Sequence, residues 1–162
     1  MLNGREMRVT MDELRTAATA YQNERNAEKL AAAEKNRATG EAFLKENGTR
    51  NGVVVLDSGL QYRIIEPGNG EAPTETDTVV VHYIGRLLNG KEFDSSYGRG
   101  QPAELGVGDV IPGWQQALQL MHVGSKWEVW IPASLGYGAD GAGSIGPNET
   151  LHFDIELIEI KS

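Results

Sequence analysis

The sequence predicts an α+β protein, in which a long helix precedes an antiparallel sheet that has one face buried under a short helix. Two observations support this fold class. Residues 1–48 contain no proline, and most of them favour a helix. From Val53 onward the apolar residues alternate, which is the period of half-buried strands, and a single helical pattern interrupts them. We therefore expect two parts, a helix over residues 1–48 and one domain over residues 49–162.

The first helix has recognisable start and stop signals. "TMDE", residues 10–13, has the spacing of a capping box, in which a hydroxyl and a carboxylate satisfy free backbone amides. "ENG", residues 46–48, supplies the stop, with Gly48 expected in the left-handed conformation. These limits predict a helix of about 37 residues, or roughly 55 Å.

The apolar residues of this helix gather near its start, in a stripe with 4-3-4-3 spacing that consists of Met7, Met11, Leu14, Ala18 and Tyr21. We expect the stripe to form an interface with another molecule, or the remaining part of an interface within a truncated N-terminal module, because an amphipathic face must be buried somewhere. Between Gln22 and Ala42 the only large apolar residue is Leu30. That segment is predicted to be a solvent-exposed bridge between modules.

Residues 49–162 read as strands around one short helix. "GLQYRII" places Leu60, Tyr62 and Ile64 on one face. "TVVVHYIGRLLNGKEFDSS" predicts a hairpin whose Asn89-Gly90 suits a type I′ turn.

The rest of this part continues the same pattern. "QALQLMHVG" predicts the short helix, with a stop at Gly124, and "SKWEVWIP" and "TLHFDIELIEI" predict two further strands. About 110 residues suffice for one core of this kind.

Charge and composition exclude several classes of function. Residues 1–48 carry eight basic and eight acidic residues, so the whole net charge of −8 lies in residues 49–162. Such a domain would repel nucleic acid and anionic membranes. The chain has no cysteine, which excludes disulfides, thiolate metal sites and cysteine nucleophiles. It has no apolar run long enough to cross a bilayer and no secretory signal at its N-terminus.

Two other features do not indicate catalytic chemistry. "GYGADGAGSIGP", residues 136–147, lacks the spacing and the lysine of a phosphate loop, so we expect a long hairpin loop whose Tyr137 and Ile145 can form a lid. His82, His122 and His152 stand singly, and we expect no metal site. We expect His82 and His152 to project from the sheet face opposite their apolar neighbours.

Two short stretches remain open on spacing alone. In "EFDSSYGRG", Asp94 follows Phe93 and is either a turn former or a carboxylate at the edge of a pocket. In "DVIPGWQQALQLM", Trp114 is either ordinary core or the floor of a pocket.

Three longer blocks are similar to a known family. "VVVHYIGRLLNGKEFDSSYGRGQP", "VIPGWQQALQLMHVGSKWEVWIP" and "LGYGADGAGSIGPNETLHFDIELIEI" closely resemble, in this order, FKBP-type peptidyl-prolyl cis–trans isomerases, over about residues 58–160. The upstream part resembles the bacterial subgroup of macrophage infectivity potentiator (Mip) and FkpA proteins. The resemblance implies a twisted half-barrel sheet around the short helix, and a long helix that leads from a dimerisation module, within which we expect this chain to begin.

The resemblance also implies a proline pocket, with Asp94, Tyr137, Ile111 and Tyr83 as its catalytic residues. Its substrate-binding residues would be Tyr83, Phe93, Leu105, Val110, Ile111, Trp114, Ile145 and Phe153. This sequence departs from the family where Leu105 replaces a common aromatic residue, and where Ile145-Gly146-Pro147 replaces Ile-Pro-Pro. Both departures bear on selectivity and inhibitor affinity.

The implied activity is isomerisation of Xaa-Pro bonds in unfolded or partly folded polypeptides, without a cofactor or metal, together with chaperone activity. The alternative is a binding or chaperone module with weak or vestigial isomerase activity. Macrolide inhibitors of the rapamycin and tacrolimus type are implied ligands. We expect a homodimer for the full-length protein, and a monomer or weak dimer for this chain. The implied location is the periplasm or outer-membrane surface of a Gram-negative bacterium, with the cytoplasm as the alternative.

Overall fold

The long helix starts earlier than its capping box predicts. The structure is a computed structural model that describes the backbone of residues 3–161 and the side chains of residues 23–161. α1 (Asn3–Asn47) already includes Thr10, so the prediction that the helix begins there is wrong. Residues 3–9 contain no proline, and each residue added to an existing helix gains one hydrogen bond at little cost. The apolar stripe from Met7 to Tyr21 lies outside the described side chains.

α1 ends at Asn47, as the sequence predicts, but not through a left-handed glycine. Gly48 is not among the residues with positive φ, and its N–H still donates to the Leu44 carbonyl at 2.9 Å. Glycine suits the close packing here, because a Cβ at this position would lie 3.0 Å from Cγ2 of Val55, which would have to shift slightly. Asn47 is buried at this junction and donates from Nδ2 to Oε1 of Gln61 at 2.9 Å.

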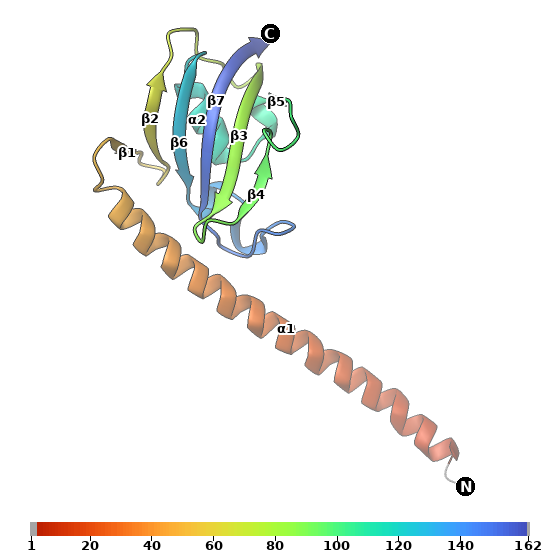
Figure 1. Cartoon of the computed structure of the whole chain (residues 1–162). Coiled ribbons are helices and arrows are strands. Elements are labelled where there is room, and N and C mark those ends of the chain that lie inside the picture. Colours follow the sequence, from red (N-terminus) through yellow and green to blue (C-terminus); the bar gives the residue numbers. More distant parts are fainter. Residues whose placement is uncertain (1–2, 162) are drawn as a thin grey trace.

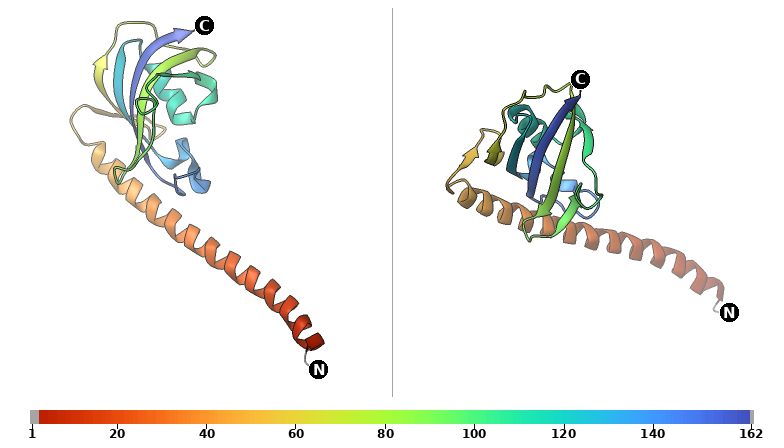
Figure 2. Two further views of the ribbon diagram at one scale, coloured as in Figure 1. Left: turned by 45° about the vertical axis from the view of Figure 1, so that its right-hand side comes forward. Right: turned by 45° about the horizontal axis from the view of Figure 1, so that its top comes forward.

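The remaining elements form a seven-stranded antiparallel sheet that curves around one short helix (Figures 1 and 2). The strand order is β1-β2-β6-β7-β3-β4, and β5 pairs with β3 beside β4. This arrangement confirms the predicted fold class. The elements are β1 (Val53–Val55), β2 (Gln61–Pro67), β3 (Thr78–Leu87), β4 (Glu92–Ser95), β5 (Ala103–Gly106), η1 (Val107–Asp109), α2 (Pro112–Leu120), β6 (Ser125–Ile131), η2 (Ala133–Leu135), η3 (Gly138–Asp140) and β7 (Leu151–Lys161).

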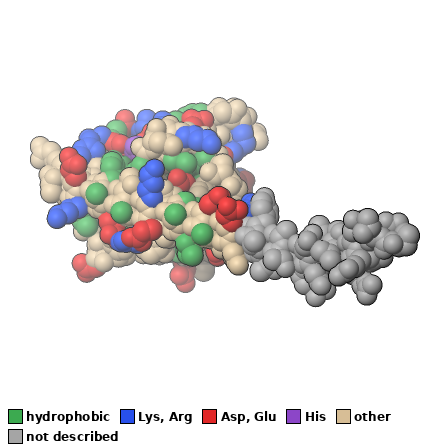
Figure 3. Space-filling model, turned by 90° about the horizontal axis from the view of Figure 1, so that it is seen from below, with side chains coloured by type: hydrophobic (Ala, Val, Ile, Leu, Met, Phe, Trp, Pro, Cys, Tyr) green, Lys and Arg blue, Asp and Glu red, His purple; other side chains and the backbone are tan. Residues whose placement is uncertain are grey.

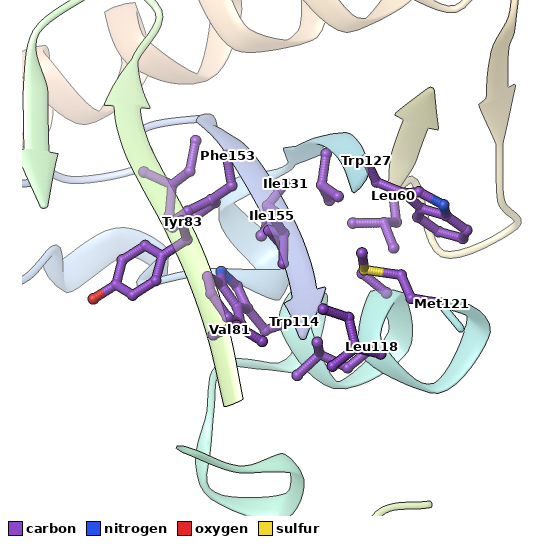
Figure 4. Packing of buried hydrophobic residues seen from close by; sticks show 14 of the residues in the cluster. Leu60, Val81, Tyr83, Trp114, Leu118, Met121, Trp127, Ile131, Phe153 and Ile155 are labelled. Carbon is purple, nitrogen blue, oxygen red and sulfur yellow. The ribbon is translucent and has the colours of Figure 1, made fainter. Parts of the chain in front are cut away.

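The core lies between the sheet and α2, and Figure 4 shows its packing. Burial alternates along the whole of β3, with Val79, Val81 and Tyr83 facing the core. α2 contributes Ala117 and Leu118, which are fully buried against this face. Period-two burial on a sheet and a helix packed across it are what the sequence pattern predicts.

Two local predictions need correction. The β3–β4 turn is not type I′, because Gly90 (φ 89°) has positive φ and Asn89 does not. Gly90 N–H donates to the Leu87 carbonyl and Leu87 N–H to the Lys91 carbonyl, each at 2.9 Å. This pattern indicates a three-residue loop, in which a left-handed glycine follows a type I turn.

The other correction concerns the end of the short helix. α2 ends at Leu120, before Gly124, whose φ of 92° instead serves the turn into β6.

The predicted shared face of Leu60, Tyr62 and Ile64 agrees with the register, since Tyr62 pairs with Val129 and Ile64 with Trp127. Tyr62 also stacks on Trp127 with ring centroids 4.1 Å apart, while Ile64 is 46% exposed. The pairing of β2 with β6 shifts register just after Ile64, where β1 no longer covers the edge.

One face of the molecule carries side chains of both charges (Figure 3). Seen from below, the described residues show acidic and basic side chains interspersed, with small apolar groups between them (Figure 3). Within the described part of the chain, no helix has the length and apolar character needed to span a lipid bilayer.

Candidate active site

A cavity of about 340 Å³ opens between β3, β4, the segment that leads into α2, and the loop after β6. Because β3 and β7 are neighbours, their buried faces present side chains to the same wall. α2 then supplies the floor. The lining residues are Tyr83, Phe93, Asp94, Leu105, Asp109, Val110, Ile111, Trp114, Tyr137 and Phe153.

Four aromatic rings form the inner surface. Trp114 meets Tyr83 edge-on at 5.1 Å between centroids and Phe153 at 5.2 Å, with interplanar angles of 89° and 88°. Phe93 meets Phe153 in the same way at 5.5 Å. Such edge-to-face contacts hold rings in fixed orientations and stabilise the arrangement beyond area burial. Trp114, 4% exposed, therefore belongs to the core and to the cavity floor at once, so the two readings of this residue are compatible.

A charged cluster borders the rim of the cavity. The Tyr83 hydroxyl donates to Oδ2 of Asp94 at 2.5 Å, and Arg99 donates to Oδ1 of Asp94 at 2.7 Å and to the Tyr83 oxygen at 2.9 Å. The Ser95 amide donates to Oδ1 of Asp94 at 2.9 Å. These bonds fix the carboxylate and the phenol relative to each other. Both oxygens of the Asp94 carboxylate therefore accept hydrogen bonds from within the protein.

These contacts change the protonation behaviour of the cluster. Burial, followed by the hydrogen bond to Asp94, raises the pKa of Tyr83 above its ordinary value. Burial also acts to raise the pKa of Asp94, but hydrogen bonds from Tyr83 and Arg99 outweigh it and hold the pKa below its ordinary value. Asp94 is therefore ionised and Tyr83 neutral across the neutral pH range.

Two lining residues carry donors that have no partner in the described part of the chain. Ile111 precedes α2 as its N-cap, and no hydrogen bond within that part uses its backbone N–H. The Tyr137 hydroxyl likewise has no partner there, and its side chain is 38% exposed at the mouth of the cavity. Both groups are free to donate to a ligand carbonyl.

The structure brings together every sequence-predicted site residue except one. Tyr83, Phe93, Asp94, Leu105, Val110, Ile111, Trp114, Tyr137 and Phe153 all line the cavity. Ile145 does not line it. Its side chain is 7% exposed and packs in the core cluster that also contains Tyr83, Trp114 and Phe153, so its role in substrate binding stays a prediction.

Two residues at the site were missed. Asp109 lines the cavity beside Val110, and Arg99 completes the cluster with Asp94 and Tyr83. The only sequence signal for Arg99 was an isolated basic residue in "SSYGRG", five positions after Asp94. The signal for Asp109 was an acidic residue directly before the apolar Val110-Ile111.

The single histidines on the sheet lie as predicted, on the face opposite Tyr83 and Phe153. His82 accepts from or donates to Ser96 at 2.7 Å and stacks on Tyr97. Among the described residues, one group could offer three metal ligands, namely Glu128, His152 and Asp154, whose ligand atoms lie within 4.8 Å of one another. Arg63 and Arg86 pair with the two carboxylates, so these positive charges oppose a cation there.

Comparisons with known proteins agree with this geometry. The family model described as "FKBP-type peptidyl-prolyl cis-trans isomerase" matches residues 69–158, and the model for the domain amino-terminal to it matches residues 1–64. The chain belongs to the FKBP-type peptidyl-prolyl cis–trans isomerases. It is therefore an enzyme that interconverts the cis and trans forms of Xaa-Pro bonds in polypeptides.

Individual relatives place it near the Mip and FkpA proteins. The chain is 47% identical to the outer membrane protein MIP of Legionella longbeachae, over 99% of this chain and 71% of that protein. It is 46% identical to the 22 kDa FKBP-type isomerase of Escherichia coli, over 98% of this chain and 78% of the relative. The crystal structure of FkpA from E. coli superposes with a TM-score of 0.85 at 40% identity, covering 96% of this chain and 71% of that one.

Proposed function

We propose that the aromatic cavity binds the prolyl ring of a substrate, and that the enzyme lowers the isomerisation barrier without forming a covalent bond. An Xaa-Pro bond prefers trans by only about 0.5–1 kcal/mol, but its partial double bond imposes a barrier of roughly 18–20 kcal/mol. The enzyme need only bind the twisted amide more tightly than either planar form. The observation that carries this proposal is an apolar cavity with two unpaired donors at its edge.

The cavity favours the twisted amide in two ways. A planar amide is the more polar form, because resonance places negative charge on its oxygen, so an apolar, water-poor site destabilises it more than the twisted form. The rings that make the site apolar are those of Trp114, Phe93 and Phe153. The Ile111 N–H and the Tyr137 hydroxyl then hold the substrate carbonyl while the bond turns.

The sequence leaves two roles for Asp94, which are orienting the rim and contacting the substrate carbonyl carbon. Its hydrogen bonds support the first. Both carboxylate oxygens already accept from Tyr83, Arg99 or the Ser95 amide, so Asp94 acts mainly by fixing the Tyr83 ring at the cavity wall. This makes Asp94 a positioning residue.

A protease-free isomerisation assay on a proline tetrapeptide tests the proposal. Tyr137→Phe removes one donor and keeps the ring, so kcat/KM is expected to fall by up to about tenfold, the loss of one hydrogen bond worth roughly 0.5–1.5 kcal/mol. Tyr97→Phe is the matched control, because that tyrosine is exposed and stacks on His82, outside the cavity lining. Equal activities of the wild type and Tyr137→Phe would refute the donor role, and wild-type activity equal to buffer would refute catalysis by this chain.

We further propose that the protein acts on unfolded or partly folded chains as a chaperone. The support is the match of residues 1–64 to the amino-terminal domain of the family and the long α1, which extends away from the sheet (Figure 1). Suppression of aggregation of a proline-poor client is expected to survive Tyr137→Phe. Loss of suppression together with isomerase activity would contradict a separate chaperone function.

Macrolides of the rapamycin and tacrolimus type are proposed inhibitors, because a prolyl-like ring matches the aromatic cavity. Leu105 presents a smaller wall than an aromatic residue would, so Leu105→Phe is expected to tighten macrolide binding. Calorimetric titration of both forms decides this.

We also propose an envelope location, supported by the name of the Legionella relative, and fractionation of the native bacterium tests it.

A further inference from the structure

One face of α1 lies against the segment that carries Tyr137. We call residues 136–150 the flap, since they connect β6 to β7 and include η3. Figure 2 shows α1 passing beside this segment, well before its junction with the sheet. The contacting positions on α1 are Lys29, Ala33, Asn36 and Gly40, which are three or four residues apart and therefore share one helix face.

Two hydrogen bonds join the helix to the flap. Nδ2 of Asn36 donates to the Pro147 carbonyl at 2.9 Å, and Nδ2 of Asn148 donates to the Ala33 carbonyl at 3.3 Å. The pair is reciprocal, because each element supplies one side-chain amide to the backbone of the other. Lys29 and Asp140 also lie 3.8 Å apart, but both are exposed and this ion pair contributes little.

The close approach of α1 to the flap depends on small residues of the helix. Ala33 is buried against the domain, and a Cβ at Gly40 would lie 2.2 Å from Oγ1 of Thr150. A helix that only bridged two modules through solvent would need neither feature. The prediction of a solvent-exposed bridge holds for most of this segment, including Leu30 at 71% exposure, but not for Ala33 and Gly40, which are buried.

The contact continues from the base of the flap to the cavity. Asn148 has a φ of 54°, and its backbone N–H donates to the Gly138 carbonyl at 2.8 Å. Gly138 directly follows Tyr137, whose carbonyl accepts from the Gly141 N–H at 3.2 Å. Asn148 thus bonds to α1 through its side chain and to the residue beside Tyr137 through its backbone. Its left-handed backbone allows both bonds at once.

We propose that α1 is part of the isomerase site, with Asn36 and Asn148 as positioning residues that hold Tyr137 over the cavity through the flap. The inference rests on the proposed role of Tyr137 in binding the substrate. Tyr137 is the lining residue contributed by the flap, and a misplacement of about 1 Å is enough to weaken catalysis severely.

A double-mutant cycle between Asn36 and Tyr137 tests this inference. Asn36→Asp keeps the size of the side chain but replaces the donor with an oxygen that faces the Pro147 carbonyl. Asn23→Asp is the matched control, because it makes the same charge change at an exposed position of α1. Asn148→Gly is a second variant, which keeps the left-handed backbone accessible and removes the side-chain donor.

The expected result is a loss in kcat/KM of about threefold to tenfold for Asn36→Asp and for Asn148→Gly, and none for Asn23→Asp. In a Tyr137→Ala background, Asn36→Asp is expected to cause no further loss. Equal losses in both backgrounds would show a purely structural role and overturn the inference, and so would unchanged activity in both variants. The single Tyr137→Ala variant separates this from the proposed function, because full activity in that variant would refute the role of Tyr137 itself.

Discussion

At the residue scale, Trp114 shows how one side chain serves both packing and binding. It is the third residue of α2, and its ring contacts Tyr83 and Phe153 edge-on while lying at the floor of the cavity. Trp114 is 4% exposed and still lines the cavity, so it can meet a ligand without exposing the core. Both functions therefore depend on the same placement.

Replacing Trp114 by leucine separates these two functions. Trp114→Leu is expected to keep the fold, to lower the free energy of unfolding by about 2 kcal/mol and to weaken ligands that mimic proline. Denaturant unfolding and calorimetric titration with such a ligand measure the two effects. Unchanged ligand affinity would assign the tryptophan to the core only.

The Asp94 cluster predicts a pH dependence with a definite sign. The pKa of Asp94 is lower in the folded protein than its ordinary value of 3.8, so its pairing stabilises the fold fully above that value. The difference in the free energy of unfolding between wild type and Asp94→Asn should be constant from about pH 5 to 8, and should be lost as the pH falls through the folded pKa. Unfolding measured along this pH series checks it, and a difference that persists undiminished in strong acid would contradict the assignment. The raised pKa of Tyr83 implies that its hydroxyl ionises only above pH 10.

The resemblance predicted the residues of this site, including Tyr83 and Phe153, which are far apart in the sequence and which spacing alone does not bring together. Spacing alone left Trp114 open between core and pocket floor, and the structure places it with Val110 and Ile111 in the lining of the cavity. Ile145, which the resemblance places in the pocket, packs in the core cluster beside the cavity, and its part in binding stays a prediction. Arg99 was missed because its partners become neighbours only when β3 pairs with β4.

At the element scale, β3 connects the core to the cavity, and Gly85 is its most constrained position. A Cβ on Gly85 would lie 2.7 Å from ring atoms of both Phe93 and Phe153. The strand therefore uses a glycine, although glycine weakens a strand, so that two rings can pack across it.

Gly85→Ala is expected to push these rings into the cavity, to cost about 1–3 kcal/mol of stability and to weaken substrate binding. The control is Gly98→Ala, where the nearest atom lies at 3.6 Å and φ is not positive. Thermal unfolding and KM of both variants test this. A Gly85→Ala protein that resembles the control would show that the rings move apart freely.

Elements also differ in how well the sequence predicts them. Alternation predicts β3 and β7 because burial on one face of a sheet requires it. The packing of α1 on the flap had no such signal, since the contact uses an alanine, a glycine and amide side chains rather than large apolar residues. Standard helix patterns do not detect a face of this kind.

At the scale of the whole molecule, a curved sheet domain is attached to a helix that continues far beyond it (Figure 1). All the net negative charge lies in residues 49–162, which suits a domain that binds neutral, apolar segments of polypeptide rather than polyanions. Near its C-terminal end the helix contacts the flap, and its N-terminal part projects away from the domain (Figure 1).

The N-terminal part of α1 leads to a prediction about assembly. The stripe from Met7 to Tyr21 has apolar residues on one helical face, so we expect this chain to be a monomer that forms a weak dimer at high concentration. Sedimentation velocity over a concentration series measures this. Met11→Glu together with Leu14→Glu should abolish the dimer, and a dimer that persists in that variant would place the interface elsewhere.

The central claim is that a substrate proline enters the aromatic cavity and that its carbonyl meets the Ile111 amide. The most direct measurement is the ¹⁵N–¹H spectrum of the protein during titration with a proline-containing peptide. The largest downfield amide shift is expected at Ile111, with the Trp114 indole shifting along the same saturation curve. Shifts concentrated outside the cavity, with Ile111 and Trp114 unchanged at saturation, would contradict the account.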